Sequence, residues 1–333
     1  MLNLTDAFSL DACIYPEEAD FCGIADDVKA SGLDAFFLTL NGDSFRTGVE
    51  SLGKAYNITD DPAQKCRVAR TYDDLLRNKA DGVLSAILYF QDPAPIENKP
   101  DLLRAFYEMG VRVIQMSYNK GGFLGAGCVE GAGYGLTDWG KRAVRMMNDL
   151  GMLVDLSHCG PRTAADAMAV SEKPVTFCHA NVKAVADNPR NKTDDQLLAL
   201  RDNGGVIGLT PWAPICWKRR EKVPPTVEDF LDHVCYAVDR IGIDHVGFAS
   251  DNNLDHKKDI VGICSQNDLY DNVVGGYNRD VGTDPGQRHA AGFSGAVDLQ
   301  NLIDAMRSRG FQDGEIRKFL GGNFLRVLKE VWR

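Results

Sequence analysis

Residues 152–179 read MLVDLSHCGPRTAADAMAVSEKPVTFCH, and this stretch decides the fold. Two short apolar runs, Met152–Leu156 and Val175–Cys178, flank a longer amphipathic segment, Pro161–Ala169. The short runs predict buried strands and the longer segment predicts a helix, because the two kinds of element differ in length and in hydrophobic period. A strand, a helix and a second strand in this order are typical of a parallel sheet covered by helices.

The same alternation continues along most of the chain. The strand candidates are rich in Val, Ile, Leu and Phe without strict alternation, which is typical of strands buried on both faces. Besides the two above, they are Phe8–Ile14, Ala35–Leu40, Val83–Phe90, Val111–Ser117, Val206–Thr210 and His245–Ala249. Further helices are predicted at Leu102–Met109, Thr137–Leu150, Asp194–Asp202 and Val227–Ile241, with Thr137 and Thr193 at N-cap positions and two or three more helices between Leu299 and Trp332.

Eight alternations of strand and helix predict an α/β protein built as a (β/α)8 TIM barrel. A doubly wound sheet is the alternative, but no Gly-x-Gly-x-x-Gly follows the first strand. We expect one barrel domain over residues 1–333, because barrels of this size commonly form a single domain. Two long loops, 121–135 and 252–292, follow strand ends on the side where barrel active sites lie, so we expect them to form a rim or lid.

Composition excludes several classes of partner. The net charge of −10 argues against nucleic acid and anionic membranes, because both require a basic face. Met1–Asp11 has no basic segment followed by a long apolar run, so we expect no signal peptide, and no run of 18 apolar residues predicts a membrane span. Nine cysteines without a Cys-x-x-Cys pair predict reduced thiols in a cytoplasmic protein.

Two histidines follow neighbouring predicted strands. His158 comes just after Met152–Leu156, and His179 comes just after Val175–Cys178. Adjacent strands of a barrel end at the same mouth, so the two imidazoles should converge there. Two neutral imidazoles at close range are a sound start for a zinc site.

Two charged residues are expected at the same mouth. Asp251 ends the last predicted strand and could bind the metal or transfer a proton from an attacking water, although a turn cap is the structural alternative. Arg190 lies in a loop after the sixth strand and could bind a substrate carboxylate through two hydrogen bonds, although a solvated loop charge is the alternative.

Several motifs resemble those of the membrane (renal) dipeptidase family, and the resemblance is collinear from Gly110 onward. The matching stretches are Leu153-Val154-Asp155-Leu156-Ser157-His158, Pro174-Val175-Thr176-Phe177-Cys178-His179, Asn188-Pro189-Arg190-Asn191 with Asp194-Asp195-Gln196-Leu197, Val246-Gly247-Phe248-Ala249-Ser250-Asp251 and Gly321-Gly322-Asn323-Phe324-Leu325-Arg326. The resemblance implies an amidohydrolase-like barrel hydrolase with zinc bound by His158 and His179. It also implies that Asp251 assists the attacking water, that Arg190 holds the carboxylate of a dipeptide, and that the protein is a homodimer.

The chain departs from the family pattern at four positions. The family's strand-one His-x-Asp aligns with Cys13 and Tyr15, which leaves Cys13 as the one remaining candidate ligand of the first metal. No glutamate stands near Gln91, where the family has a glutamate that bridges two zinc ions. Tyr118 stands where the family has a histidine that stabilises the tetrahedral intermediate. The two-metal site is therefore incomplete, and we expect about one zinc ion per chain.

A single ion needs at least one ligand besides the two histidines. Asp251, Cys128 and Glu130 are the candidates, and a thiolate from Cys128 with two imidazoles would make a good zinc set. Cys128 could instead be a small buried apolar residue, and Glu130 could be a general base or a solvated loop acid. Tyr118 could donate a hydrogen bond to an oxyanion or simply fill the wall.

Three functions are compatible with these residues. The first is a metal-dependent hydrolase that cleaves a small dipeptide-like or amide substrate with a free carboxylate. The second is an enzyme of the same fold with lyase, isomerase or metal-free chemistry on a small carboxylated metabolite. The third is a non-catalytic barrel that binds a ligand, which retention of His158, His179, Arg190 and Asp251 together disfavours.

Overall fold

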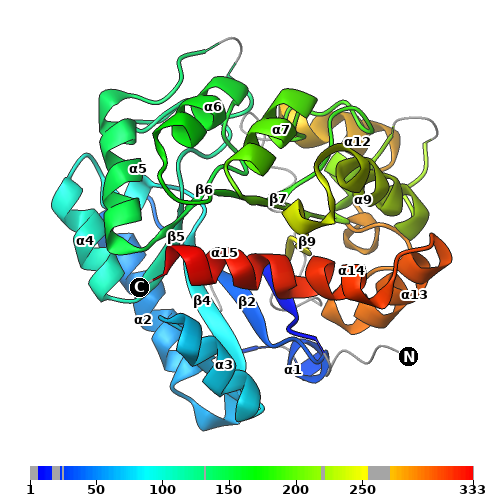
Figure 1. Ribbon diagram of the computed structural model, residues 1–333, viewed down its shortest axis with the longest axis horizontal. Coiled ribbons are helices and arrows are strands. Elements are labelled where there is room, and N and C mark those ends of the chain that lie inside the picture. Colours follow the sequence, from blue (N-terminus) through cyan, green and yellow to red (C-terminus); the bar gives the residue numbers. More distant parts are fainter. Residues whose placement is uncertain are drawn as a thin grey trace.

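The computed structural model describes residues 7–16, 23–24, 26–130, 133–218, 222–253 and 271–332. One curled parallel sheet runs through this part of the chain, with helices packed around it (Figure 1). The strands are β1 (Leu10–Tyr15), β2 (Ala35–Leu40), β3 (Cys66–Val68), β4 (Leu84–Phe90), β5 (Val111–Gln115), β6 (Leu153–Asp155), β7 (Thr176–Ala180), β8 (Val206–Leu209), β9 (Val246–Phe248) and β10 (Asn252–Asn253). All eight predicted strands are present, and the barrel-type fold is confirmed.

The strand order shows how the sheet curls round. It runs β10-β1-β2-β4-β5-β6-β7-β8-β9, and β3 pairs with β4 beside this path. β9 and β10 belong to one short stretch, Val246–Asn253, whose first part pairs with β8 and whose last part pairs with β1. This stretch therefore joins the two ends of the sheet, as a barrel requires.

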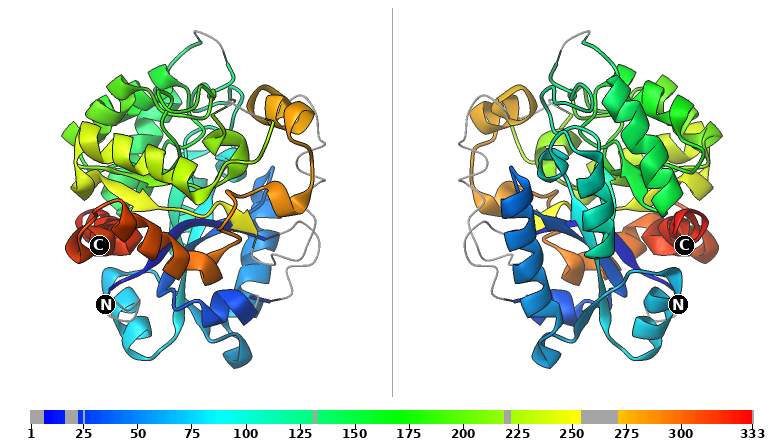
Figure 2. Two further views of the ribbon diagram at one scale, coloured as in Figure 1. Left: turned by 90° about the vertical axis from the view of Figure 1, so that its right-hand side faces the viewer. Right: turned by 90° about the vertical axis from the view of Figure 1, so that its left-hand side faces the viewer.

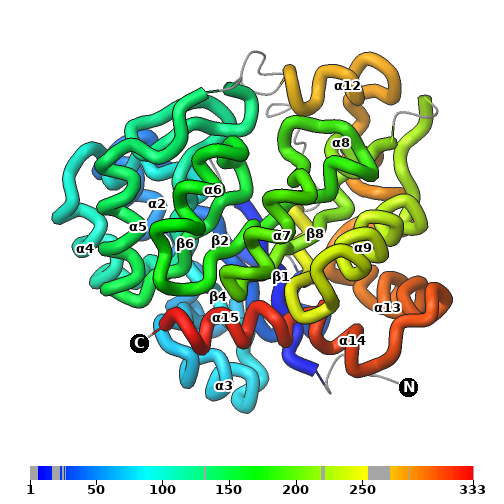
Figure 3. Tube along the Cα trace, turned by 45° about the horizontal axis from the view of Figure 1, so that its top comes forward, coloured from blue at the N-terminus to red at the C-terminus, as the bar shows by residue number. Residues whose placement is uncertain are grey.

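Helices follow the strands and cover the outer face of the sheet (Figure 3). The α-helices are α1 (Asp26–Ala30), α2 (Phe45–Thr59), α3 (Tyr72–Ala80), α4 (Pro100–Glu108), α5 (Asp138–Leu150), α6 (Pro161–Val170), α7 (Asp194–Asp202), α8 (Ala213–Cys216), α9 (Val227–Ile241), α12 (Gly276–Asp280), α13 (Leu299–Ser308), α14 (Asp313–Arg317) and α15 (Asn323–Val331). Shorter helical turns are η2 (Pro62–Gln64), η3 (Ala94–Ile96), η4 (Ile243–His245), η5 (Asp271–Gly275), η6 (Pro285–Gln287), η7 (Ala296–Asp298) and η8 (Lys318–Gly322). The predicted caps are confirmed, since Thr137 accepts a hydrogen bond from Gly140 N–H and Thr193 accepts one from Gln196 N–H.

Two apolar layers hold the barrel together. The outer layer lies between the sheet and its helices, and the inner layer fills the barrel. The last helix, α15, closes one end of the barrel by adding Phe324, Val327 and Val331 to the inner layer. A Cβ atom on Gly247 would lie 2.7 Å from the Phe324 ring, so the absence of a side chain at Gly247 lets the helix pack closely against β9.

The opposite end of the barrel carries the long loops. Figure 2 shows the segment with η5 and α12 well separated from α15. In the loop 121–135, Leu124, Ala126 and Gly127 are buried. Ala126 N–H donates to the Thr163 hydroxyl group, and the Ala126 carbonyl accepts from that hydroxyl and from Gly160 N–H. Of the predicted loop 252–292, residues 254–270 lie outside the described residues. Among the described residues, no helix combines the length and the apolar character needed to cross a bilayer.

One predicted boundary changes the position of a site residue. The prediction ended the sixth strand at Cys178 and placed His179 just beyond it, but β7 continues to Ala180, which pairs with Leu209 of β8. His179 therefore lies within the strand, because the parallel pairing with β8 extends past the apolar run.

Candidate functional site

The site is built around two imidazoles that face each other at the carboxyl ends of neighbouring strands. His158 follows β6 and His179 lies near the end of β7, and their Nε2 atoms are 2.9 Å apart. Both side chains are buried, with 6% and 0% of their surface exposed. The structure thus brings together the two histidines whose convergence the strand order predicts.

The surroundings keep both imidazoles neutral. Burial, the positive charge of Arg190 and the neighbouring imidazole lower the pKa of His158 well below its usual value. Burial, Arg190 and Lys192 do the same to the pKa of His179. A neutral imidazole keeps a lone pair, which is the form that binds a metal ion.

Two contacts hold the His158 ring, one at its Nδ1 atom and one on its face. Its Nδ1 lies 2.8 Å from the side-chain oxygen of Asn119, so this nitrogen donates and Nε2 carries the lone pair. Asn119 adopts φ +48°, a left-handed conformation that asparagine tolerates better than most residues. Tyr118 stacks on the His158 ring with 4.1 Å between ring centroids and 20° between planes. The predicted oxyanion donor therefore lies directly against one of the predicted ligands.

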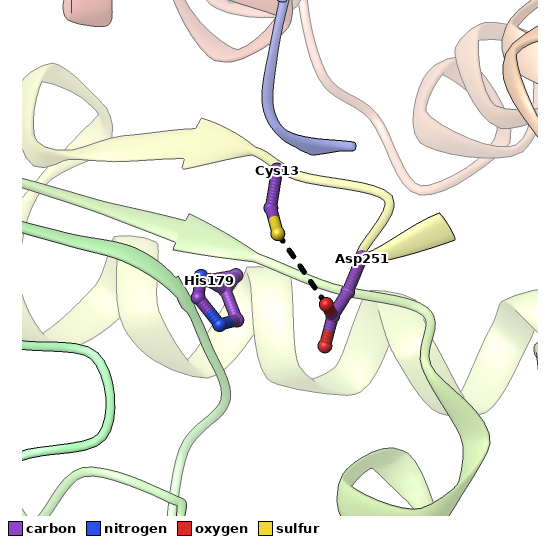
Figure 4. Close-up of side chains that lie close together, drawn as sticks. All are labelled: Cys13, His179 and Asp251. Carbon is purple, nitrogen blue, oxygen red and sulfur yellow. Dashed lines mark hydrogen bonds between the residues drawn. The ribbon is translucent and has the colours of Figure 1, made fainter. Parts of the chain in front are cut away.

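Cys13 and Asp251 complete the centre of the site (Figure 4). Cys13 lies on β1 and Asp251 follows β9, and their side chains point toward each other and toward His179. The Cys13 thiol donates to Asp251 Oδ1 over 3.4 Å, and the ligand atoms of Cys13, His179 and Asp251 all lie within 4.8 Å of one another. Asp251 has φ +53°, an uncommon conformation for a residue other than glycine and one that clusters at functional sites.

Two opposing effects act on the pKa of the Asp251 carboxyl group. Burial raises the pKa of its carboxyl group, while Arg190 and the hydrogen bond from Cys13 act in the opposite direction. A carboxylate whose pKa is raised from that of a free aspartate is better suited to accept and return a proton near neutral pH.

Gln91 lies next to Cys13, near the position where the family resemblance would require a glutamate. Its side-chain N–H group donates to the Cys13 sulfur over 3.1 Å and to the Thr39 hydroxyl over 3.0 Å. An amide brings no negative charge and offers N–H donors, so Gln91 acts here as a hydrogen-bond donor to the Cys13 sulfur.

Arg190 and Lys192 are buried cations that bind the backbone next to the two histidines. Arg190 is 2% exposed; its Nη2 donates to the carbonyl of His179 over 2.9 Å and its Nη1 donates to the carbonyl of Ser157. Lys192 donates to the carbonyl of Ser157 over 2.6 Å, and burial lowers its pKa to about 8. Both cations therefore orient the backbone segments that carry His158 and His179.

A buried network joins β4, β6 and β7 below the imidazoles. Tyr89 donates to Asp155 Oδ2 over 2.5 Å, and Asp155 Oδ1 accepts hydrogen bonds from Ser157 N–H over 3.1 Å and Cys178 N–H over 2.8 Å. The carboxylate thus connects the residue before His158 with the residue before His179. Sequence reasoning did not identify Tyr89 or Asp155 as supports, because their role depends on contacts across three strands.

The two candidates from the glycine-rich loop lie farther from the centre. Cys128 is half-buried, and its sulfur donates to the same Asn119 oxygen that binds His158 Nδ1, over 3.4 Å. Glu130 is exposed, and its Oε1 accepts a hydrogen bond from Gly121 N–H over 3.0 Å. Neither belongs to the group formed by Cys13, His179 and Asp251. The sequence signal that could have pointed to Cys13 is its place on strand one, where the family resemblance puts a histidine.

Comparison with known proteins shows the family to which the chain is similar. Residues 21–261 and 271–333 match the family model described as Membrane dipeptidase (Peptidase family M19). Dipeptidase tcpJ of Claviceps purpurea is 28% identical over 86% of this chain, which spans only 60% of that relative's length. An amidohydrolase structure from Pseudomonas aeruginosa is 26% identical with a TM-score of 0.86, covering 99% of this chain and 98% of its own.

A further solved structure shares the fold. It is a metallopeptidase from Rhodobacter sphaeroides, liganded with a phosphinate mimic of the dipeptide L-Ala-D-Ala. It is 21% identical with a TM-score of 0.78, covering 98% of this chain and 99% of its own. With a family model that matches nearly the whole sequence, the chain belongs to the membrane dipeptidase family, peptidase family M19.

Proposed function

We propose that the chain is a metal-dependent hydrolase of small dipeptide-like substrates that carry a free carboxylate. The observation that carries this proposal is the pair of neutral, facing imidazoles with Cys13 and Asp251 beside them. The names of the dipeptidase relatives and the dipeptide mimic bound by the Rhodobacter sphaeroides enzyme support it.

The residues of the site fit a single zinc ion. The Nε2 atoms of His158 and His179 are 2.9 Å apart, against about 3.3 Å for two nitrogen ligands of a tetrahedral zinc, so a small movement of one ring would suffice. The Nδ1 atom of His179 is buried and has no hydrogen-bond partner among the described residues. Nitrogen, sulfur and oxygen donors together suit zinc better than magnesium or calcium, which prefer oxygen alone.

The protein side chains then have separate roles. The ion, when bound, supplies Lewis acidity that makes water a better nucleophile near neutral pH. Asp251 accepts the proton of the attacking water and returns it to the leaving amine. Tyr118 donates a hydrogen bond to the oxygen that becomes negative as the amide carbonyl is attacked. Arg190, as the family resemblance implies, attracts the substrate carboxylate with its positive charge.

The predicted roles of Cys128 and Glu130 rest on weaker support. The Cys128 sulfur contacts the side of Asn119 and not the imidazole pair, and Glu130 braces its own loop. Asp251 is the better placed acid or base, because it contacts Cys13 directly and lies within 4.8 Å of a His179 nitrogen. Both loop residues therefore stay as predictions, and Cys128→Ser tests the first of them.

The proposal also covers the domain organisation, the oligomeric state and the cellular compartment of the enzyme. We expect one barrel domain over residues 1–333, with loops 121–135 and 252–292 at its active-site end, and a homodimer as the family resemblance implies. The seven cysteines in the described part of the chain are all free thiols, which supports a reducing compartment such as the cytoplasm.

Metal content is the decisive test. We expect about one zinc ion per chain in protein purified without chelator, and hydrolysis of some members of a dipeptide and N-acyl amino acid panel. A His158→Ala, His179→Ala double variant should lose both, whereas His245→Ala, which changes a half-buried histidine bonded to the carbonyl of Gly205, should keep the metal. Protein that takes up no metal even after incubation with zinc would overturn the proposal.

A further inference from the structure

Two thiols lie close to the imidazole pair, and their positions relative to His158 differ. An imidazole has two nitrogens on different edges of the ring, and only one of them faces the second histidine. In this site Nε2 of His158 faces His179, while Nδ1 is bonded to Asn119. A third ligand must therefore approach from the Nε2 side.

Cys128 lies on the other side of the ring. Its sulfur contacts the Asn119 side-chain oxygen over 3.4 Å, and that oxygen is 2.8 Å from His158 Nδ1. The backbone fixes this arrangement, because Cys128 N–H donates to the His158 carbonyl over 2.8 Å and Val129 N–H donates to the Asn119 carbonyl over 2.9 Å. Cys128 would reach the Nε2 atoms only if the loop 121–135 changed its backbone conformation.

Cys13 lies on the side where a ligand is needed. Its sulfur belongs to the group of ligand atoms within 4.8 Å of one another that also includes His179 and Asp251. His158 is not part of this group, so its ring must move toward the sulfur for both imidazoles and the thiolate to bind one ion. The Cys13 sulfur and Asp251 Oδ1 are 3.4 Å apart. This is about the separation of a sulfur and an oxygen ligand of one tetrahedral zinc. It is also a normal distance between a thiol and a proton acceptor. Cys13 has 0% of its surface exposed, so its position is fixed by β1.

We propose that the Cys13 thiolate is a protein ligand of the ion together with His179 and, once its ring moves toward the sulfur, His158, and that Asp251 remains free to transfer protons. This inference rests on the proposed function, since it names the ligand set of that site. Two imidazoles and one thiolate leave the fourth position open for water, as in catalytic zinc sites. The thiol proton passes to solvent when the ion binds, so each ion bound releases one proton.

The neighbours of Cys13 are more polar than a cysteine that only fills a core requires. Gln91 N–H points at the sulfur over 3.1 Å, and the Thr39 hydroxyl is 4.0 Å away. A cysteine that merely filled the barrel would need no polar partners. Here an amide donor, a hydroxyl and a carboxylate surround the sulfur. Burial and Asp251 raise the pKa of the Cys13 thiol well above its usual value, so the bound ion is what would form the thiolate.

Cobalt(II) provides a spectroscopic test that does not depend on activity. Cobalt added to metal-free protein should produce a thiolate-to-cobalt charge-transfer band in the near ultraviolet. The band should disappear in Cys13→Ser, with at least about 100-fold weaker cobalt binding, because even the loss of an outer partner of a ligand costs 10- to 100-fold. It should persist in Cys128→Ser and in Cys235→Ser, which changes a half-buried cysteine on α9.

The outcomes separate this inference from the proposed function. Cobalt binding without the band in wild-type protein, or a band that vanishes in Cys128→Ser and persists in Cys13→Ser, would overturn the role of Cys13 but keep the metal site. A wild-type protein that binds no cobalt would overturn both. If Cys13→Ser fails to fold, X-ray absorption at the zinc edge decides: zinc-loaded wild-type protein and Cys128→Ser should both show one sulfur ligand, and a zinc site without sulfur in either protein contradicts the inference.

Discussion

Asn119 and His158 are joined by a 2.8 Å hydrogen bond that decides which nitrogen of the imidazole faces the site. Because the side-chain oxygen of Asn119 only accepts, His158 Nδ1 carries the proton and Nε2 presents its lone pair to His179. We expect Asn119→Ala to weaken zinc binding about 10- to 100-fold, as loss of an outer partner does in other metal sites. Competition with a chromophoric chelator measures the affinity.

Asn119→Asp is the matched variant for this prediction. A carboxylate preserves the acceptor and tolerates the left-handed backbone at φ +48°, so zinc affinity should stay within a few-fold of wild type. Equal affinity in Asn119→Ala and wild type would show that His158 needs no help from Asn119.

Gly127 permits the close approach of its loop to Asn119. A Cβ atom at Gly127 would lie 2.1 Å from the carbonyl carbon and oxygen of Asn119, which are backbone atoms that cannot rotate away. We expect Gly127→Ala to lower the free energy of unfolding by about 1–3 kcal/mol, the usual cost of overpacking, and to weaken zinc binding as Asn119 moves. Urea unfolding and chelator competition measure the two effects.

Gly122 in the same loop provides the control. A Cβ atom there meets no atom within 4 Å among the described residues, so Gly122→Ala should change neither stability nor zinc affinity appreciably. Similar losses in both variants would mean that the loop responds to any added side chain and that the contact with Asn119 is unimportant.

Tyr89 stabilises the carboxylate that links the two histidine-bearing strands. Burial and the adjacent Asp155 raise the pKa of the Tyr89 phenol well above its usual value, so it stays protonated and donates to Asp155. Tyr89→Phe removes this donor and leaves a buried carboxylate oxygen with one partner fewer. We expect a loss of about 1–3 kcal/mol in the free energy of unfolding.

Tyr56→Phe is the comparison for Tyr89→Phe. The hydroxyl of the half-buried Tyr56 donates to the Met109 carbonyl and accepts from Arg70 over 2.9 Å. Because Arg70 is exposed and water can replace both bonds, the loss of this hydroxyl should cost about 1 kcal/mol. Equal losses in the two variants, measured by urea unfolding, would contradict a special role for the Tyr89–Asp155 bond.

Most of the fold could be predicted because buried parallel strands carry apolar runs that the sequence displays directly. The bounds of β2, α7 and α9 agree with the prediction residue for residue. β3 and β10 were not predicted, because Cys66–Val68 contains a charged residue and Asn252–Asn253 is wholly polar, so neither forms an apolar run. β10 nevertheless matters, because its pairing with β1 brings Asp251 beside Cys13.

The site could be predicted only as far as strand ends determine it. His158, His179 and Asp251 gather at one mouth because each stands at the carboxyl end of a strand. The choice between Cys13 and Cys128 depends on which edge of the His158 ring each thiol approaches. That choice follows from the turn at Asn119 and the close contact at Gly127, and neither leaves a pattern in the sequence.

His233 makes the stability of the protein depend on pH through a contact away from the catalytic centre. It lies in α9, where Nδ1 accepts a hydrogen bond from Val182 N–H over 3.1 Å and Nε2 is 3.3 Å from the Cys216 carbonyl. Nδ1 can accept from Val182 N–H only while the ring is neutral, and burial lowers the pKa of His233 from 6.5 to about 4. A histidine in the unfolded chain binds a proton more readily, so acid favours unfolding.

The stabilisation from neutral His233 is complete above pH 6.5 and is lost as the pH falls from 6.5 toward 4. The loss should reach about 3 kcal/mol, since each tenfold change in proton affinity is worth about 1.4 kcal/mol. His233→Asn keeps an acceptor for Val182 N–H but cannot titrate, so its free energy of unfolding should fall less over this range. Urea unfolding of both proteins between pH 7 and 4 measures the difference and cancels the contribution of the carboxyl groups. Parallel curves for the two proteins would show that His233 is protonated in the folded state as easily as in the unfolded chain.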